Sequence, residues 1–213
     1  MAVTKAIAAP PARGANPPRL WLLAVFAGII GLYGLSYLAG HPAPPGPATN
    51  HAGRAWLVLH AASAGSALLI GPWQFFATAP WRRRVWHRWM GRAYVVFCIT
   101  GGLAGMMLAL NASSGDFARA GFGLLAALWL TTTVLAWLAA RRGDYLSHRR
   151  WMIRSFALAF AAVTLRLELL ATLIPHVSFF AFYPWTAWIS WIPNLIVADV
   201  WLRTHGPDPR FEA

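Results

Sequence analysis

The stretch that decides the fold is His87-Arg88-Trp89-Met90-Gly91-Arg92, which returns as His148-Arg149-Arg150-Trp151-Met152-Ile153-Arg154. The two histidines are 61 residues apart, and each copy of the motif opens a long apolar segment. Apolar segments of this kind are typical of membrane helices. The repeat therefore predicts two helices that each place a histidine, arginines and a tryptophan at the same membrane depth.

The composition indicates a membrane protein. Hydrophobic residues make up 58% of the 213 residues, charged residues only 11%, and there are 13 tryptophans. Crossing about 30 Å of hydrocarbon takes roughly 20 helical residues, and alternating strand patterns typical of a membrane barrel are absent. The sequence predicts an all-α polytopic membrane protein with six transmembrane helices, at about residues 20–39, 55–78, 91–111, 120–140, 151–174 and 182–202.

The formal charge of +12 is distributed as expected for a membrane orientation signal. Basic residues gather before the first span, in the second and fourth connections and after the sixth span, against only Arg54 and Arg119 in the other loops. The positive-inside rule then places both termini in the cytoplasm. Orientation and anionic headgroups explain these clusters, so a nucleic-acid partner is excluded. Cys98 is the only cysteine, which excludes an intrachain disulfide and CxxC chemistry.

The chain divides into a membrane domain with two tails. Residues 1–19 are rich in proline and are predicted to form a disordered cytoplasmic tail, and residues 203–213 a short second one. Residues 20–202 form the six-helix domain, with a core at about residues 55–175. The repeat indicates that spans two to five are two related hairpins, and parallel repeats of this kind create sites at the axis between them.

The helix faces single out the repeated histidines. At 100° per residue, His87 and His148 each head a stripe of mostly small residues on the third and fifth spans. Small residues allow close helix packing or leave room for a flat ring. Two neutral imidazoles on facing helices suit a six-coordinate haem b iron, with Arg92 and Arg154 near its propionates. The alternative is that both histidines are interfacial residues in an arginine belt. Neither has a zinc-site spacing.

A second polar group is predicted inside the membrane. Arg166 and Glu168 lie well within the fifth span, where a charge is costly unless it is paired or faces a polar cavity. They point to nearly opposite sides of the helix, and His60 heads the stripe of the second span near the outer surface. Glu168 is expected to bond a neighbouring threonine, pair with His60 or take up a proton. Asp199 in the sixth span is expected to be a structural partner for Arg92 or Arg154.

Three segments carry a family resemblance: HRWMGRAYV at 87–95, GFGLLAALWLTTT at 121–133 and HRRWMIRSFALAFAAVTLRLE at 148–168. Over about residues 55–175 the chain resembles the bacterial predicted integral-membrane family called domain of unknown function 2306, which implies no activity. The layout is more distantly similar to trans-membrane di-haem cytochromes b. Those proteins carry a histidine on each of four core helices, whereas span four of this chain has none.

Two classes of function follow. The first is a membrane redox protein that binds b-type haem at the cytoplasmic side between spans three and five and relays electrons from quinol or a small reductant. The second is a cofactor-free accessory subunit or small-molecule carrier with a polar cavity at Arg166. The expected partners are the lipid bilayer and a quinone or another membrane subunit. The resemblance implies a bacterial inner membrane.

Overall fold

The computed structural model describes residues 18–40, 50, 52–75, 80–173 and 178–204, and all regular structure in this part of the chain is helical. This confirms the all-α class. The predicted tails lie outside the described residues except for their innermost positions, which are helical. The elements are α1 (Pro18–Ser36), η1 (Tyr37–Ala39), α3 (Arg54–Ile70), η2 (Gly71–Gln74), α4 (Pro80–Leu110), α5 (Asp116–Arg141), α6 (Tyr145–Ala159), α7 (Ala161–Leu169), η3 (Leu170–Leu173), α8 (Phe179–Ile189) and α9 (Ile192–Thr204).

Four of the helical segments are long and apolar enough to cross a membrane. They are Pro18–Ala39, Arg54–Gln74, Val85–Leu110 and Asp116–Arg141. These correspond to the first four predicted spans, and their length follows from uninterrupted apolar sequence. A typical hydrocarbon layer of about 30 Å is matched by roughly 20 such residues.

The predicted fifth and sixth spans are each divided into two shorter helices. Between α6 and α7 the hydrogen-bond ladder continues, because the Phe160 N–H donates to the Phe156 carbonyl at 2.8 Å and the Thr164 N–H to the Phe160 carbonyl at 3.2 Å. Between α8 and α9 the break has a chemical cause. Pro193 has no N–H to donate to the carbonyl four residues earlier. The sixth segment is therefore a broken helix, whereas the fifth is one hydrogen-bonded rod.

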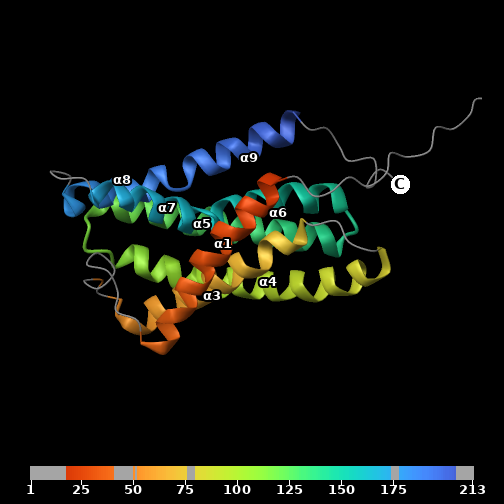
Figure 1. Cartoon of the computed structure of the whole chain (residues 1–213), viewed down its shortest axis with the longest axis horizontal. Coiled ribbons are helices and arrows are strands. Elements are labelled where there is room, and N and C mark those ends of the chain that lie inside the picture. Colours follow the sequence, from red (N-terminus) through yellow and green to blue (C-terminus); the bar gives the residue numbers. More distant parts are fainter. Residues whose placement is uncertain (1–17, 41–49, 51, 76–79, 174–177, 205–213) are drawn as a thin grey trace, which may run out of the picture.

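The helices lie side by side with their ends gathered at two opposite ends of the molecule. The start of α4, the α5–α6 turn and the end of α9 lie at one end (right in Figure 1), and the α4–α5 turn and α8 at the other. α3 packs between α1 and α4, α5 packs between α4 and α6, and α8 and α9 cover α5 and α6. Both copies of the repeated motif therefore come to the same end.

The interior combines small and polar residues with some large buried side chains, while many large apolar side chains face outward. Ser155 and Thr133 are completely buried, as are Ala67 and Cys98. By contrast, the exposed fractions of large apolar side chains on the outer helix faces reach 62% for Leu32, 54% for Leu103 and 68% for Val197. A soluble monomer rarely exposes so much contiguous apolar surface. The apolar outer surface of the helices is therefore suited to contact with lipid.

Glycines let α1 and α3 approach unusually closely. A Cβ added at Gly34 would lie 2.5 Å from the Ala61 carbonyl oxygen, and one at Gly65 would lie 2.6 Å from the Gly31 carbonyl oxygen. Backbone atoms cannot move aside as the end of a flexible side chain can. Close contact through small residues is the usual way in which membrane helices associate, and here it brings α1 against the core.

The helices that carry the repeated motif begin earlier than predicted. α4 starts at Pro80 and α6 at Tyr145, so residues that the sequence assigned to connections are helical. Proline suits the first helical turn, where its missing N–H has no partner to lose. At α6 the Asp144 carboxylate accepts the Ser147 backbone N–H at 2.9 Å. Hydrogen bonds from Ser147 lower the pKa of this exposed carboxyl.

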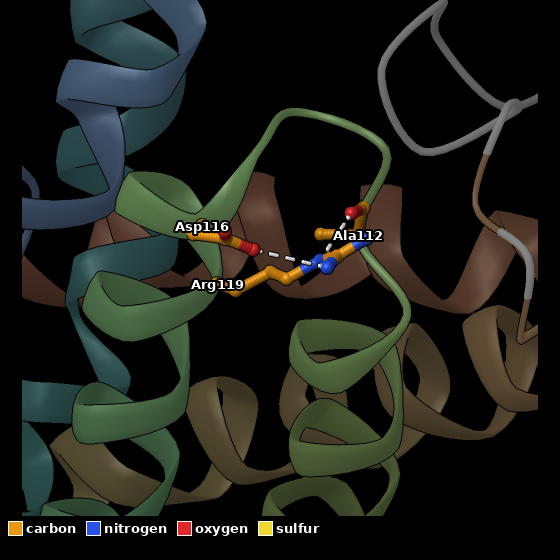
Figure 2. Close-up of polar contacts among 3 residues, drawn as sticks. All are labelled: Ala112, Asp116 and Arg119. Atoms are coloured by element: carbon orange, nitrogen blue, oxygen red, sulfur yellow. Dashed lines mark hydrogen bonds and ion pairs between the residues drawn. The ribbon is translucent and has the colours of Figure 1, made fainter.

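The turn between α4 and α5 is held by an arginine (Figure 2). Arg119 donates through Nε to the Ala112 carbonyl at 2.8 Å, and its terminal nitrogen lies 3.1 Å from Asp116 Oδ1. The same guanidinium thus satisfies a backbone acceptor at the end of α4 and the first carboxylate of α5. Arg119 fixes the local turn.

Candidate functional site

The two repeated histidines face each other. The imidazole rings of His87 on α4 and His148 on α6 have centroids 6.4 Å apart and planes at 84°. Both side chains are partly buried at the end of the bundle that carries the arginine-rich segments. The helix stripes predicted from the sequence therefore do bring these two residues together.

The tautomer of His148 is set by the backbone. Its Nδ1 lies 2.9 Å from the Ala136 carbonyl oxygen on α5. Because a carbonyl can only accept, Nδ1 carries the proton, and in the neutral ring Nε2 keeps its lone pair. A histidine oriented in this way through its other nitrogen is the usual arrangement of a metal ligand.

The two arginines expected beside this pair differ in their surroundings. Arg154 Nε lies 2.8 Å from Asp199 Oδ1, so the predicted role of Asp199 as a structural partner is realised with Arg154 rather than with Arg92. The Arg92 guanidinium is exposed and lies 5.0 Å from the Trp89 ring centroid. Of these two cations, Arg92 is the one that remains available to an anionic group.

A chain of hydroxyl groups lies inward from the histidines, and sequence reasoning missed it. Tyr94 Oη lies 3.2 Å from Ser155 Oγ, which lies 2.7 Å from Thr133 Oγ1. Thr133 donates its own proton to the Trp129 carbonyl at 2.8 Å. Each hydroxyl has one proton, so Ser155 donates to Thr133 and Tyr94 donates to Ser155. The chain links α4, α6 and α5 in one direction.

The hydroxyl contact repeats the spacing of the histidine contact. Tyr94 and Ser155 are 61 residues apart, as are His87 and His148. Residues that contact their own counterparts are what a two-fold axis between equivalent units produces. The shared spacing was the signal in the sequence that could have found the hydroxyl pair. Both contacts join α4 to α6, which are the second helices of the α3–α4 and α5–α6 hairpins.

The predicted intramembrane group separates into two environments. His60 Nδ1 lies 2.8 Å from the Gly101 carbonyl oxygen, and both His60 and Arg166 line one cavity of about 330 Å³. Glu168 is not among the described residues that line it. Thr164, one of the partners considered for Glu168, instead hydrogen-bonds Asn194 on α9 at 2.9 Å.

The other histidines, Asn111 and the possible metal ligands remain to be placed in the structure. His41, His51, His176 and His205 lie outside the described residues. Asn111, just after α4, donates to the Met107 carbonyl four residues earlier at 2.8 Å. Within the described ranges no group of three or more His, Cys, Asp or Glu side chains is arranged to hold a metal ion.

A comparison with protein-family models identifies the relationship of the chain. The model of the family described as "Predicted membrane protein (DUF2306)" matches residues 57–202. The chain belongs to this family. No match was found among curated proteins or among solved structures.

The region shared with the DUF2306 family contains both polar sites. It extends from α3 to α9 and therefore continues through the sixth predicted segment, beyond the resemblance noted from sequence motifs. His60, His87, His148 and Arg166 all fall within it. α1 lies before the matched residues, and its side chain Tyr33 also lines the Arg166 cavity.

Proposed function

We propose that this protein is a membrane redox protein that binds one b-type haem between His87 and His148 and relays electrons from quinol or a small reductant. The observation that supports it is the histidine pair, with ring centroids 6.4 Å apart. Imidazole nitrogens bind a metal at about 2 Å, and a ring centre lies about 1 Å behind its nitrogen, so two histidines that held one ion between them would have ring centres roughly 6 Å apart. The observed spacing fits such a pair.

The donor set also favours a cofactor over a bare ion. Within the described residues no third His, Cys, Asp or Glu joins the pair, whereas structural metal sites usually take four ligands from the protein. A haem supplies four ring nitrogens of its own and, when bound, one-electron redox chemistry. His148 would present Nε2, because its Nδ1 proton is held by Ala136. Arg92 would meet a propionate, while Arg154 is already engaged by Asp199.

The proposal includes a topology. We infer six crossings in a bacterial inner membrane, with both termini and the histidine pair at the cytoplasmic side. The supporting features are the basic residues at the histidine end and the packing of α6 and α8 along the long helix α5, with α9 against α6. Basic residues near the ends of spans remain in the cytoplasm as a rule.

A visible spectrum of the purified full chain, expressed with ample haem, tests the function. The expected result is a Soret band with sharp α and β bands on reduction, lost in both His87→Ala and His148→Ala. Ser147→Ala is the matched control, since it changes the same turn of α6 but keeps the backbone N–H that Asp144 accepts. It should keep the spectrum. Colourless wild-type protein would refute the haem proposal, and a spectrum unchanged in both histidine variants would refute these ligands.

A further inference from the structure

Arg166 lines a cavity at the end of the molecule opposite the histidine pair. The cavity has a volume of about 330 Å³ and reaches from the interior to the α4–α5 turn. Most of its lining residues are apolar. The larger polar and aromatic side chains that line it include Tyr33, Tyr37, His60, Trp129, Arg166 and Tyr183, which lie on α1, η1, α3, α5, α7 and α8. A mainly apolar pocket with a few convergent polar groups is the usual form of a small-molecule site.

The guanidinium of Arg166 is incompletely satisfied. One terminal nitrogen donates to the Ala162 carbonyl at 3.2 Å, on the same helix, and Cζ lies 5.5 Å from the Tyr33 ring centroid. Nε is buried and has no hydrogen-bond partner in the described part of the chain. An arginine side chain has five N–H donors and stays charged. The structure thus holds a cation whose donors exceed its acceptors.

The described carboxylates do not neutralise it. Asp116 pairs with Arg119 and Asp199 with Arg154, and Asp144 caps α6 at the other end of the molecule. Glu168 lies two residues from Arg166, but no ion pair joins them, and one of its carboxylate oxygens is buried without a hydrogen-bond partner. A buried charge that lacks a counter-ion is costly. The carboxylates that the structure describes thus supply no counter-charge for Arg166, and an anionic ligand in the cavity would supply it.

His60 gives the cavity a second polar group. Its Nδ1 donates to the Gly101 carbonyl at 2.8 Å, so in the neutral ring Nε2 is an acceptor. Gly105 makes room for this ring, because a Cβ there would lie 2.9 Å from Nδ1. The ring is thereby held in one orientation.

From these features we propose that the Arg166 cavity binds a singly charged organic acid with an apolar body. A carboxylate or phosphate oxygen pair matches the planar donor fork of arginine, and the apolar lining accepts the rest of the molecule. The volume of about 330 Å³ lies at the lower end of the range of small-molecule pockets, about 300–1,000 Å³, which suits a small acid. The acid group belongs either to a free carboxylate or to the headgroup of an anionic phospholipid.

Thermal unfolding of delipidated protein in neutral detergent tests the free acid, with octanoate as the probe and octanol as its uncharged analogue. At 100 times Kd, octanoate should raise the Tm by roughly 5–10 °C, and octanol should not raise it. Arg166→Leu should abolish the rise without lowering the Tm of the unliganded protein, because it removes an uncompensated cation. Arg166→Lys should bind about tenfold more weakly, since it loses the fork.

Native mass spectrometry of the purified protein tests the lipid source. Anionic phospholipid retained by the wild type and absent from Arg166→Leu supports the proposal with a headgroup as the ligand. Arg141→Leu is the matched control, because it removes an exposed cation that does not line the cavity; it should keep either response. The proposal is overturned if neither ligand binds, or if Arg166→Leu keeps the response. His148→Ala should leave it intact, which separates this site from the haem proposal.

Discussion

Breaking the hydroxyl chain at Ser155 should destabilise the bundle in a way that depends on Tyr94. Both side chains are completely buried, and the Tyr94 hydroxyl donates to Ser155 on a different helix. Ser155→Ala leaves that hydroxyl without its acceptor and removes the proton that Thr133 accepts. Tyr94→Phe removes the same contact from the other side, but Ser155 keeps its bond to Thr133. The two substitutions therefore share one hydrogen bond and differ in what they leave unpaired.

The expected magnitudes follow from this difference. An unsatisfied buried hydroxyl costs about 1–3 kcal/mol, and a lost hydrogen bond alone about 1 kcal/mol. Ser155→Ala should therefore lower the free energy of unfolding by about 2 kcal/mol and Tyr94→Phe by about 1 kcal/mol. Interhelical hydrogen bonds in membrane proteins average about 0.6 kcal/mol in double-mutant cycles and reach about 1.7. Since both groups here are completely buried, the double variant should fall short of additivity by about 1 kcal/mol.

Reversible unfolding in mixed micelles, followed by circular dichroism as the denaturing detergent is titrated, measures the cycle. Thr132→Val with Tyr94→Phe is the control pair, because the Thr132 hydroxyl donates only within its own helix, to the Leu128 and Trp129 carbonyls. That pair should be additive. If Tyr94→Phe and Ser155→Ala also add within about 0.3 kcal/mol, the directed chain of hydroxyl groups is wrong.

Two further outcomes are expected. Gly65→Ala should destabilise the protein by about 1–3 kcal/mol, because its Cβ would meet the Gly31 carbonyl on α1. Gly28→Ala, where a Cβ meets nothing within 4 Å, should not, and equal losses of Tm would contradict the close α1–α3 contact. Reporter fusions at Gly143, in the α5–α6 turn, should be active in the cytoplasm, and fusions at Gly115 on the opposite side. The reverse pattern would overturn the topology.

Local sequence signals predicted much of the fold because membrane helices depend on local apolar length. The stripes of small residues placed His87 against His148, and Asp199 was expected to pair with Arg92 or Arg154 and pairs with Arg154. The helix starts were wrong because arginine and tryptophan do not end a helix, so the basic motif continues the apolar rod. Pro193 indicates a helix break before α9, but the prediction of a single sixth span followed the continuous apolar sequence instead.

The contacts between distant helices could not be predicted from the sequence. Tyr33 on α1 contributes to the cavity because the glycines of α1 and α3 bring the two helices together, and no local pattern states which helix lies beside α7. Thr133 looked like an ordinary residue of an apolar span. Its role depends on the position of Ser155, which is fixed only when α5 and α6 pack.

The continuous helical segment α6–α7 connects the two ends of the molecule. His148, Ser155 and Arg166 lie on one stripe of α6–α7, and 18 residues separate the first from the last, a rise of about 27 Å. Because the ladder continues through Phe160, the register between these residues is fixed by helical geometry rather than by loops. The histidine pair, the hydroxyl chain and the Arg166 cavity then occupy successive levels of one helix. A membrane-depth separation of this size explains why the two polar sites can hold different chemistry while sharing the same structural element.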